Sequence, residues 1–306
     1  MISGLRRTTL HCLAATAALV AGGLMLGSTA MAEDQDRTWC YDENSNPDHT
    51  IAGCSALIKS GRNLLATEFY NRGLAWRRKG DIDRSIADYT EAIRIDPNHA
   101  SAYKNRGRAN FYAGNFDAAI SDLARGVRET PDDAYAVVWL YLARARSGSK
   151  NAATELETNA AKLSKQSNWP YPVVELFLGR RPPEATLSAP SKADDRCEAH
   201  FYVGEWHLLQ GNPATAAAIL KIAADSCPKN FIEYTGAQAE LKRLQQYSSE
   251  NPGVTSSGDT DAASAQQHPV QTDDDAHPAR HEPHSASVHR ASKSFWRYVR
   301  AARWLH

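Results

Sequence analysis

The sequence predicts an all-α protein in which helical hairpins stack into a solenoid, followed by a disordered C-terminal tail. The main observation is a period of 34 residues, at which residues 66–97 and 100–131 align without gaps. The same period separates several pairs of identical residues, among them Gly73 and Gly107, Gly80 and Gly114, and Pro97 and Pro131. Periods of this length are typical of repeat proteins in which each unit is one pair of helices.

Within each period, the order of small and large residues resembles the tetratricopeptide repeat (TPR), a helix–turn–helix unit. Positions 8, 20, 24, 27 and 32 hold Gly73, Ser85, Tyr89, Ala92 and Pro97 in the first repeat and Gly107, Ala119, Leu123, Gly126 and Pro131 in the second. Two helices approach closely only where side chains are small, and large apolar residues fill the space beside them. We therefore expect two repeats over residues 63–133.

Further helical segments flank these two repeats. Taking Gly204 as position 8 gives a third repeat, and this repeat with a capping helix covers residues 197–247. Residues 134–196 predict a divergent segment, with helices over 134–145, 152–163 and 169–178 and a loop over 181–193. Residues 33–62 predict an N-terminal cap or half-repeat, because Asn46-Pro47 is a typical helix start.

The N-terminus has the features of a secretory signal peptide over residues 1–32. Arg6 and Arg7 precede an apolar stretch from Leu13 to Leu26, and Ala30-Met31-Ala32 supplies the small residues of a cleavage site before Glu33. A retained membrane anchor is the alternative, although the stretch is short for a membrane span. We expect a soluble periplasmic protein. Its formal net charge of +0 argues against nucleic acid as a partner.

The cysteines are consistent with export to an oxidising compartment. Four of the five remain after cleavage, and an even number suggests two disulfides. Cys197 and Cys227 are positions 1 and 31 of the third repeat, where the antiparallel helices of one hairpin bring the two ends together. Cys40 then pairs with Cys54 in the cap. Free buried thiols are the alternative.

Beyond the repeats, three segments resemble the NlpI-type bacterial lipoproteins. They are residues 137–144, 169–179 and 199–212, and Lys229–Tyr234 fits the same pattern. The resemblance spans about residues 60–245, and it implies an all-helical, often dimeric periplasmic adaptor that presents proteases and peptidoglycan hydrolases to one another. The chain departs from that family in lacking a lipobox cysteine, in its four further cysteines and in its long C-terminal tail.

The first helix of each TPR commonly lines a concave face with positions 2, 5, 6, 9, 12 and 13. In the two central repeats these positions predict a basic, aromatic groove for an extended or terminal peptide, with Tyr70, Asn71, Arg77, Arg78, Lys104, Asn105, Arg108 and Tyr112. The repeated Asn-Arg-Gly at 71–73 and 105–107 resembles part of the carboxylate clamp of eukaryotic TPR domains. The alternative is a solvated face with ion pairs to residues such as Asp81, Asp83 and Asp88.

The composition changes after Gln246 to Ser, Asp, Pro, His and Ala, which predicts a disordered linker over residues 248–294. Its five histidines, with the acidic residues 273–275, offer ligands for Zn²⁺ or Ni²⁺, but no spacing among them fixes a geometry, so an adventitious His-rich linker is favoured over a metal site. Residues 295–306 alternate aromatic side chains with Arg297, Arg300 and Arg303. A helix of this kind suits an anionic membrane surface, a partner protein or the protein's own groove.

The motifs indicate a binding protein rather than an enzyme. The sequence has no glycine-rich phosphate loop, no His–Glu metal helix and no serine elbow, so we expect no catalytic residue and no cofactor. The predicted function is a periplasmic scaffold for other envelope proteins. The alternative is an envelope-anchored protein that binds membrane or wall polymer through residues 295–306.

Overall fold

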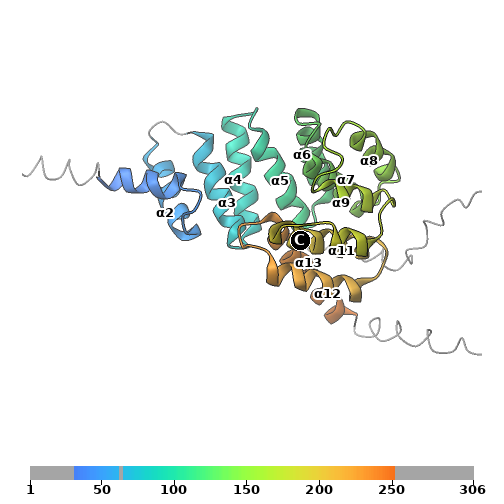
Figure 1. Cartoon of the computed structure of the whole chain (residues 1–306). Coiled ribbons are helices and arrows are strands. Elements are labelled where there is room, and N and C mark those ends of the chain that lie inside the picture. Colours follow the sequence, from blue (N-terminus) through green and yellow to red (C-terminus); the bar gives the residue numbers. More distant parts are fainter. Residues whose placement is uncertain (1–30, 62–64, 252–306) are drawn as a thin grey trace, which may run out of the picture. The chain divides into compact units, whose positions relative to one another are not determined.

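The computed structural model describes residues 31–61 and 65–251, and the regular secondary structure within these ranges is helical throughout (Figure 1). The predicted all-α class is therefore confirmed there. None of the helices in these two ranges is both long and apolar enough to cross a membrane. Residues 1–30 of the predicted signal peptide, most of the predicted linker (252–294) and the basic aromatic segment 295–306 lie outside the described residues.

The chain divides into two compact units at the junction of Ala136 and Val137, and each is considered by itself. The first unit contains an N-terminal helix (31–41), α2 (Pro47–Ser60), α3 (Ala66–Arg78), α4 (Ile82–Ile95), α5 (Ala100–Tyr112) and α6 (Phe116–Glu129). α3 packs on α4 and α5 packs on α6, while α4 joins the two hairpins. Gly80 and Gly114 form the turns within the hairpins, at φ 78° and 81°, a conformation that favours glycine.

The small residues at position 8 are where the helices of a hairpin approach most closely. A Cβ atom added to Gly73 would lie 2.8 Å from the ring of Tyr89, and one added to Gly107 would lie 2.8 Å from Leu123 Cγ. Tyr89 and Leu123 are fully buried at position 24. The contact of position 8 with position 24 thus recurs in both repeats.

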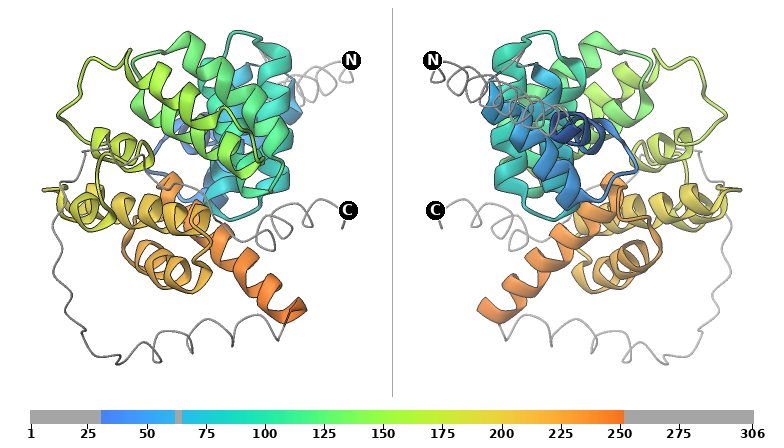
Figure 2. Two further views of the ribbon diagram at one scale, coloured as in Figure 1. Left: turned by 90° about the vertical axis from the view of Figure 1, so that its right-hand side faces the viewer. Right: turned by 90° about the vertical axis from the view of Figure 1, so that its left-hand side faces the viewer.

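The second unit begins within α7 and continues through a series of helices of unequal length. They are α7 (Ala134–Arg146), α8 (Ala152–Ala160), α9 (Tyr171–Phe177), α10 (Pro183–Ser188), α11 (Ala193–Leu209), α12 (Pro213–Ser226) and α13 (Ile232–Glu250). α11, α12 and α13 pack side by side, and the last turns of α13 project past α12 in both views of Figure 2. Gly204 lies against Leu220 as Gly107 lies against Leu123, at 2.6 Å from an added Cβ, as the register of the third repeat predicts.

Two features of the second unit differ from the sequence-based expectation. The predicted loop at 181–193 contains α10, because Pro182-Pro183 is a favourable helix start. α11 begins four residues before the predicted repeat, and Asp194 and Asp195 lie in its first turn, where acidic side chains stabilise a helix N-terminus.

Both predicted cysteine pairs are bonded. Cys40 and Cys54 join the N-terminal helix to α2, with their Cα atoms 4.7 Å apart. Cys197 and Cys227 close the α11–α12 hairpin, with a Cα separation of 5.0 Å. The segment predicted as a single capping helix or half-repeat thus forms a disulfide-linked hairpin of two helices over its described residues, which end at 61.

A buried charged cluster connects three helices of the second unit. Arg146 of α7 donates to Glu205 of α11 at 3.0 Å and to Glu240 of α13 at 3.1 Å, and all three side chains are at most 2% exposed. Arg243 also pairs with Glu240. Burial first, and then the charge of Glu240, raise the pKa of Glu205 to about 8, whereas Arg146 and Arg243 outweigh burial and lower the pKa of Glu240.

Candidate peptide-binding face

The first helices of the two central repeats, α3 and α5, carry the eight predicted groove residues. A direct side-chain contact joins the two helices. Asn105 of α5 donates from Nδ2 to the Tyr70 hydroxyl of α3 at 3.0 Å and to the Ser101 carbonyl at 3.1 Å. The Tyr70 ring lies 4.8 Å from the His99 ring and 5.9 Å from the Tyr89 ring. This group forms the aromatic and amide part of the candidate face.

Three arginines lie on the same two helices, Arg77 and Arg78 on α3 and Arg108 on α5. Burial raises the pKa of Tyr70, and the positive charges of Arg108 and Arg77 oppose that rise, which places both guanidinium groups near the phenol. Burial and then the charge of Arg77 lower the pKa of Arg78. Arg77 itself is 5% exposed. Positive charges at this density beside amide and phenol groups suit carboxylates and peptide carbonyls as ligands.

Two predicted groove residues bind main-chain carbonyls of the N-terminal hairpin. Asn71 donates to the Cys40 carbonyl at 3.0 Å, and Arg78 donates to the Ser45 carbonyl at 3.1 Å. Asn71 and Asn105 occupy the same position of successive repeats, and each reaches back to the preceding element. Position 6 therefore links one repeat to the element before it.

The remaining two predicted groove residues have other surroundings. Lys104 pairs with Asp133 at 3.1 Å, and an added Cβ at Gly126 would lie 2.8 Å from the Lys104 stem. Tyr112 is 5% exposed and meets the Phe111 ring edge-on at 6.5 Å. The structure thus gathers Tyr70, Arg77, Asn105 and Arg108 at one place, puts Asn71 and Arg78 against the N-terminal hairpin, and pairs Lys104 with a carboxylate.

The arginine in each Asn-Arg-Gly has a structural role that was not predicted from the sequence. Arg72 forms two hydrogen bonds with Asp88, at 2.8 and 2.7 Å, and Arg106 forms the same two with Asp122, both at 2.8 Å. Each pair joins the two helices of its own hairpin. The identical separation of 16 residues in both repeats was a signal that would have found it. Asp88 is thus an ion-pair partner, as the alternative of a solvated face expected. Its partner, however, is Arg72 of the same hairpin and not one of the predicted groove residues.

Asp81, another acidic residue named in that alternative, has a separate role. Asp81 caps α4 by accepting from Arg84 N at 3.1 Å and also pairs with the Arg84 side chain.

Over the described residues we find no group of three or more His, Cys, Asp or Glu side chains placed to hold a metal ion.

A family model described as tetratricopeptide repeat matches residues 70–134 and again residues 104–165. Residues 70–165 contain tetratricopeptide repeats. The two matches start 34 residues apart, which equals the period in the sequence. The second match extends through α7 and α8, so these TPRs continue into the segment that the sequence analysis described as divergent. TPR units are typically non-catalytic scaffolds that bind other proteins.

Proposed function

We propose that this protein is a periplasmic TPR scaffold that binds other proteins through extended segments. The observation that carries the proposal is the group formed by Tyr70, Asn105, Arg77 and Arg108, which sets two guanidinium charges beside the Tyr70 phenol on the first helices of two repeats. An extended peptide offers a carbonyl at every residue and carboxylates at its acidic side chains and terminus. The face suits both kinds of acceptor.

The location in the periplasm is supported by two features of different origin. The first 32 residues have the charge and apolar pattern of a signal peptide. The two disulfides belong in an oxidising compartment, since cytosolic thiols are kept reduced. In the cytosol, the Cys40–Cys54 and Cys197–Cys227 pairs would lack an oxidant.

For the clients, we propose envelope proteases or peptidoglycan hydrolases. The support is the resemblance of residues 137–144, 169–179 and 199–212 to NlpI-type adaptors, which also suggests a homodimer. The most specific of these segments is anchored in the second unit, where Trp169 donates from Nε1 to Glu198 of α11 at 2.7 Å. The proposed role is to hold clients, without a catalytic residue or a cofactor of its own.

Affinity capture from an envelope extract tests this function. The test variant reverses two charges on α5, Lys104→Glu with Arg108→Glu, and the control reverses two exposed lysines of the second unit, Lys221→Glu with Lys242→Glu. We expect the wild type and the control to retain the same proteases or hydrolases and the test variant to lose them. Equal capture by both variants would reject the groove.

A second candidate function is anchoring to membrane or wall polymer through residues 295–306, which the alternation of Phe295, Trp296, Tyr298 and Trp304 with arginine favours. Sedimentation with anionic liposomes and with peptidoglycan, using protein with and without this segment, separates the two functions. Loss of all client capture on removing residues 295–306 alone favours the anchor, and unchanged capture favours the scaffold.

A further inference from the structure

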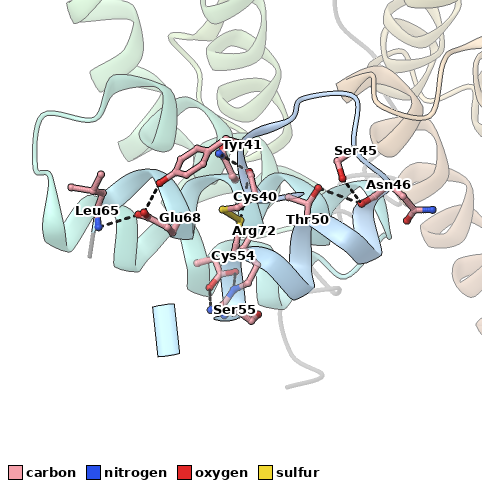
Figure 3. Close-up of a disulfide and its surroundings, with 12 residues drawn as sticks. Cys40, Tyr41, Ser45, Asn46, Thr50, Cys54, Ser55, Leu65, Glu68 and Arg72 are labelled. Atoms are coloured by element: carbon pink, nitrogen blue, oxygen red, sulfur yellow. Dashed lines mark hydrogen bonds and ion pairs between the residues drawn. A yellow bond between two sulfur atoms is a disulfide. The ribbon is translucent and has the colours of Figure 1, made fainter. Parts of the chain in front are cut away.

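The N-terminal helix depends on its disulfide to an unusual degree. Within residues 31–41, Cys40 is the one buried side chain, at 1% exposure, and the others are exposed or half-buried. Cys40, Cys54 and Leu57 form a small core of their own. Figure 3 shows the bond between the two sulfur atoms that joins this helix to α2. Besides this bond, the helix is held on α2 mainly by Trp39, which stacks on His49 at 4.8 Å, and by its close approach to Gly53. Because Trp39 is only half-buried, less hydrophobic free energy holds the helix in place once the bond is broken than a fully buried core would supply.

The same hairpin lies on the first helix of the first repeat through polar contacts. Tyr41 donates to Glu68 of α3 at 2.5 Å, and Glu68 also accepts from the Leu65 amide at 3.0 Å (Figure 3). Lys79, at the end of α3, pairs with Asp48 of α2. Together with the two carbonyl contacts of Asn71 and Arg78, these interactions follow one side of α3 from its first turn to its last.

Two of the donors in this contact are predicted groove residues, and the acceptors of these two are main-chain atoms. Asn71 and Arg78 occupy positions 6 and 13, and they bind the carbonyls of Cys40 and Ser45. A main-chain carbonyl is the same acceptor whatever the residue type, so the backbone of another peptide can present the same acceptors. The segment from Cys40 to Asn46 therefore satisfies the donors with the chemistry that a bound peptide would offer.

We propose that residues 40–46 are an internal occupant of the first repeat's peptide-binding face, and that the Cys40–Cys54 bond holds them there. This inference rests on the proposed function of the TPR face. With the bond closed, the donors of Asn71 and Arg78 are occupied, and a client meets the rest of the face. With the bond open, the N-terminal helix leaves α3, and Asn71 and Arg78 become available to a client backbone.

Opening requires a dithiol reductant. One of its thiolates attacks a sulfur of the Cys40–Cys54 bond, the S–S bond breaks, and a mixed disulfide forms with release of one cysteine thiolate. The second thiol of the reductant then displaces the other cysteine. Two electrons and two protons pass to Cys40 and Cys54, and the reductant ends as a disulfide.

The second disulfide provides a matched control within the same chain. Cys197 and Cys227 close a hairpin whose helices already bury Phe201, Leu208 and Leu220. Removing that bond lowers stability but leaves a hydrophobic core to keep α11 on α12. The pair Cys40→Ser, Cys54→Ser should therefore release a helix, and the pair Cys197→Ser, Cys227→Ser should not.

Hydrogen exchange followed by mass spectrometry measures the release without any client. In the full-length chain, we expect Cys40→Ser with Cys54→Ser to speed exchange of residues 31–46 about a hundredfold, the factor that loss of a bond closing a loop of this size corresponds to. Exchange in α5 and α6 should stay unchanged, which shows that the repeats remain folded. The Cys197–Cys227 variant should leave residues 31–46 protected. Equal protection of residues 31–46 in all three proteins overturns the inference.

A peptide added in trans tests whether the exposed face binds a backbone. The probe is a labelled peptide of residues 38–48 with Cys40→Ser, titrated by fluorescence anisotropy up to about 1 mM, where weak peptide contacts are detectable. We expect binding to the opened variant, none to the wild type, and loss of binding when Asn71→Ala and Arg78→Ala are added. Equal binding to opened and closed protein, or none to the opened protein, overturns the inference.

The two tests separate this inference from the function beneath it. Protected residues 31–46 in the opened variant reject the internal occupant and leave client capture through α5 untouched. Normal release with trans-peptide binding, but no client captured by any variant, rejects the scaffold function alone.

Discussion

Asn105 donates a hydrogen bond to the hydroxyl of Tyr70 at 3.0 Å, and this contact ties the first helix of the second repeat to the first helix of the first. Asn105 is 8% exposed, so water replaces a lost partner poorly. The bond belongs to the candidate face and to the stacking of the repeats at the same time. Changes here are therefore expected to affect stability as well as binding.

Tyr70→Phe removes only the acceptor and keeps the ring. We expect it to lower the free energy of unfolding by about 1 kcal/mol, because the buried Asn105 amide loses one of its two partners. Denaturant titration followed by circular dichroism measures the change. A loss below about 0.3 kcal/mol would show that the bond does not couple the repeats.

Gly107→Ala tests the close approach inside a hairpin. Its new Cβ would lie 2.8 Å from Leu123 Cγ in a fully buried contact. Alanine favours a helix over glycine by roughly 1 kcal/mol, but overpacking costs about 1–3 kcal/mol, so we expect net destabilisation. Gly126→Ala is the matched control, since its Cβ meets the stem of Lys104, a flexible side chain that is 20% exposed. Thermal melts should give Gly126→Ala a melting temperature at or above that of the wild type, and Gly107→Ala one below it. The reverse order of the two variants would contradict the assigned register.

Arg72→Ala tests the ion pair within the first hairpin. Asp88, whose side chain is 7% exposed, would lose both of its bonds to the guanidinium. We expect a loss of about 2 kcal/mol, because a nearly buried carboxylate is left without its cation. Lys221→Ala breaks an exposed pair with Asp225 and should cost at most about 0.5 kcal/mol. Similar losses for both variants, measured by urea unfolding, would deny the hairpin pair a structural role.

The buried carboxylates of the second unit predict opposite pH effects. The pKa of Glu205 is raised by burial and by Glu240, to about 8, so its contribution to stability is greatest when it is protonated and declines as the pH rises from the ordinary glutamate range to about 8. Glu205→Gln should remove this decline and make the protein more stable at pH 8 than the wild type.

Glu240 provides the opposite case. Its pKa is lowered by Arg146 and Arg243 against the effect of burial, so its contribution is present above the ordinary glutamate range and is lost as the pH falls through the lowered value. Glu240→Gln should destabilise at neutral pH, because both arginines lose a charged partner. Melting temperatures from pH 4 to pH 8 check both variants, and parallel curves for Glu205→Gln and wild type would refute the assignment.

The sequence predicted those parts of the fold that depend on local period and register. The 34-residue spacing assigned the small residues Gly73 and Gly107 and the large residues Tyr89 and Leu123 to the positions that form contacts in the structure. The repeat positions of Cys197 and Cys227 identified their bond. Spacing sufficed because these contacts lie within one hairpin.

Contacts between distant segments were not predictable in this way. Arg146 meets Glu205 and Glu240 across 59 and 94 residues, so no local pattern marks the cluster. The carbonyls of Cys40 and Ser45 have no side-chain signature, which is why Asn71 and Arg78 were assigned to a client rather than to the protein's own hairpin. The groove itself remains a prediction.

The central claim is that the face formed by α3 and α5 binds envelope proteins. Site-specific photo-crosslinking in living cells tests it most directly, with the crosslinker placed at Leu74, a half-buried groove position of α3, or at Ile222, which is 47% exposed on α12. We expect discrete adducts with envelope proteins from position 74, and these should disappear with Arg108→Glu. We expect no such adducts from position 222. Absence of adducts from position 74, or the same adducts from both positions, would contradict it.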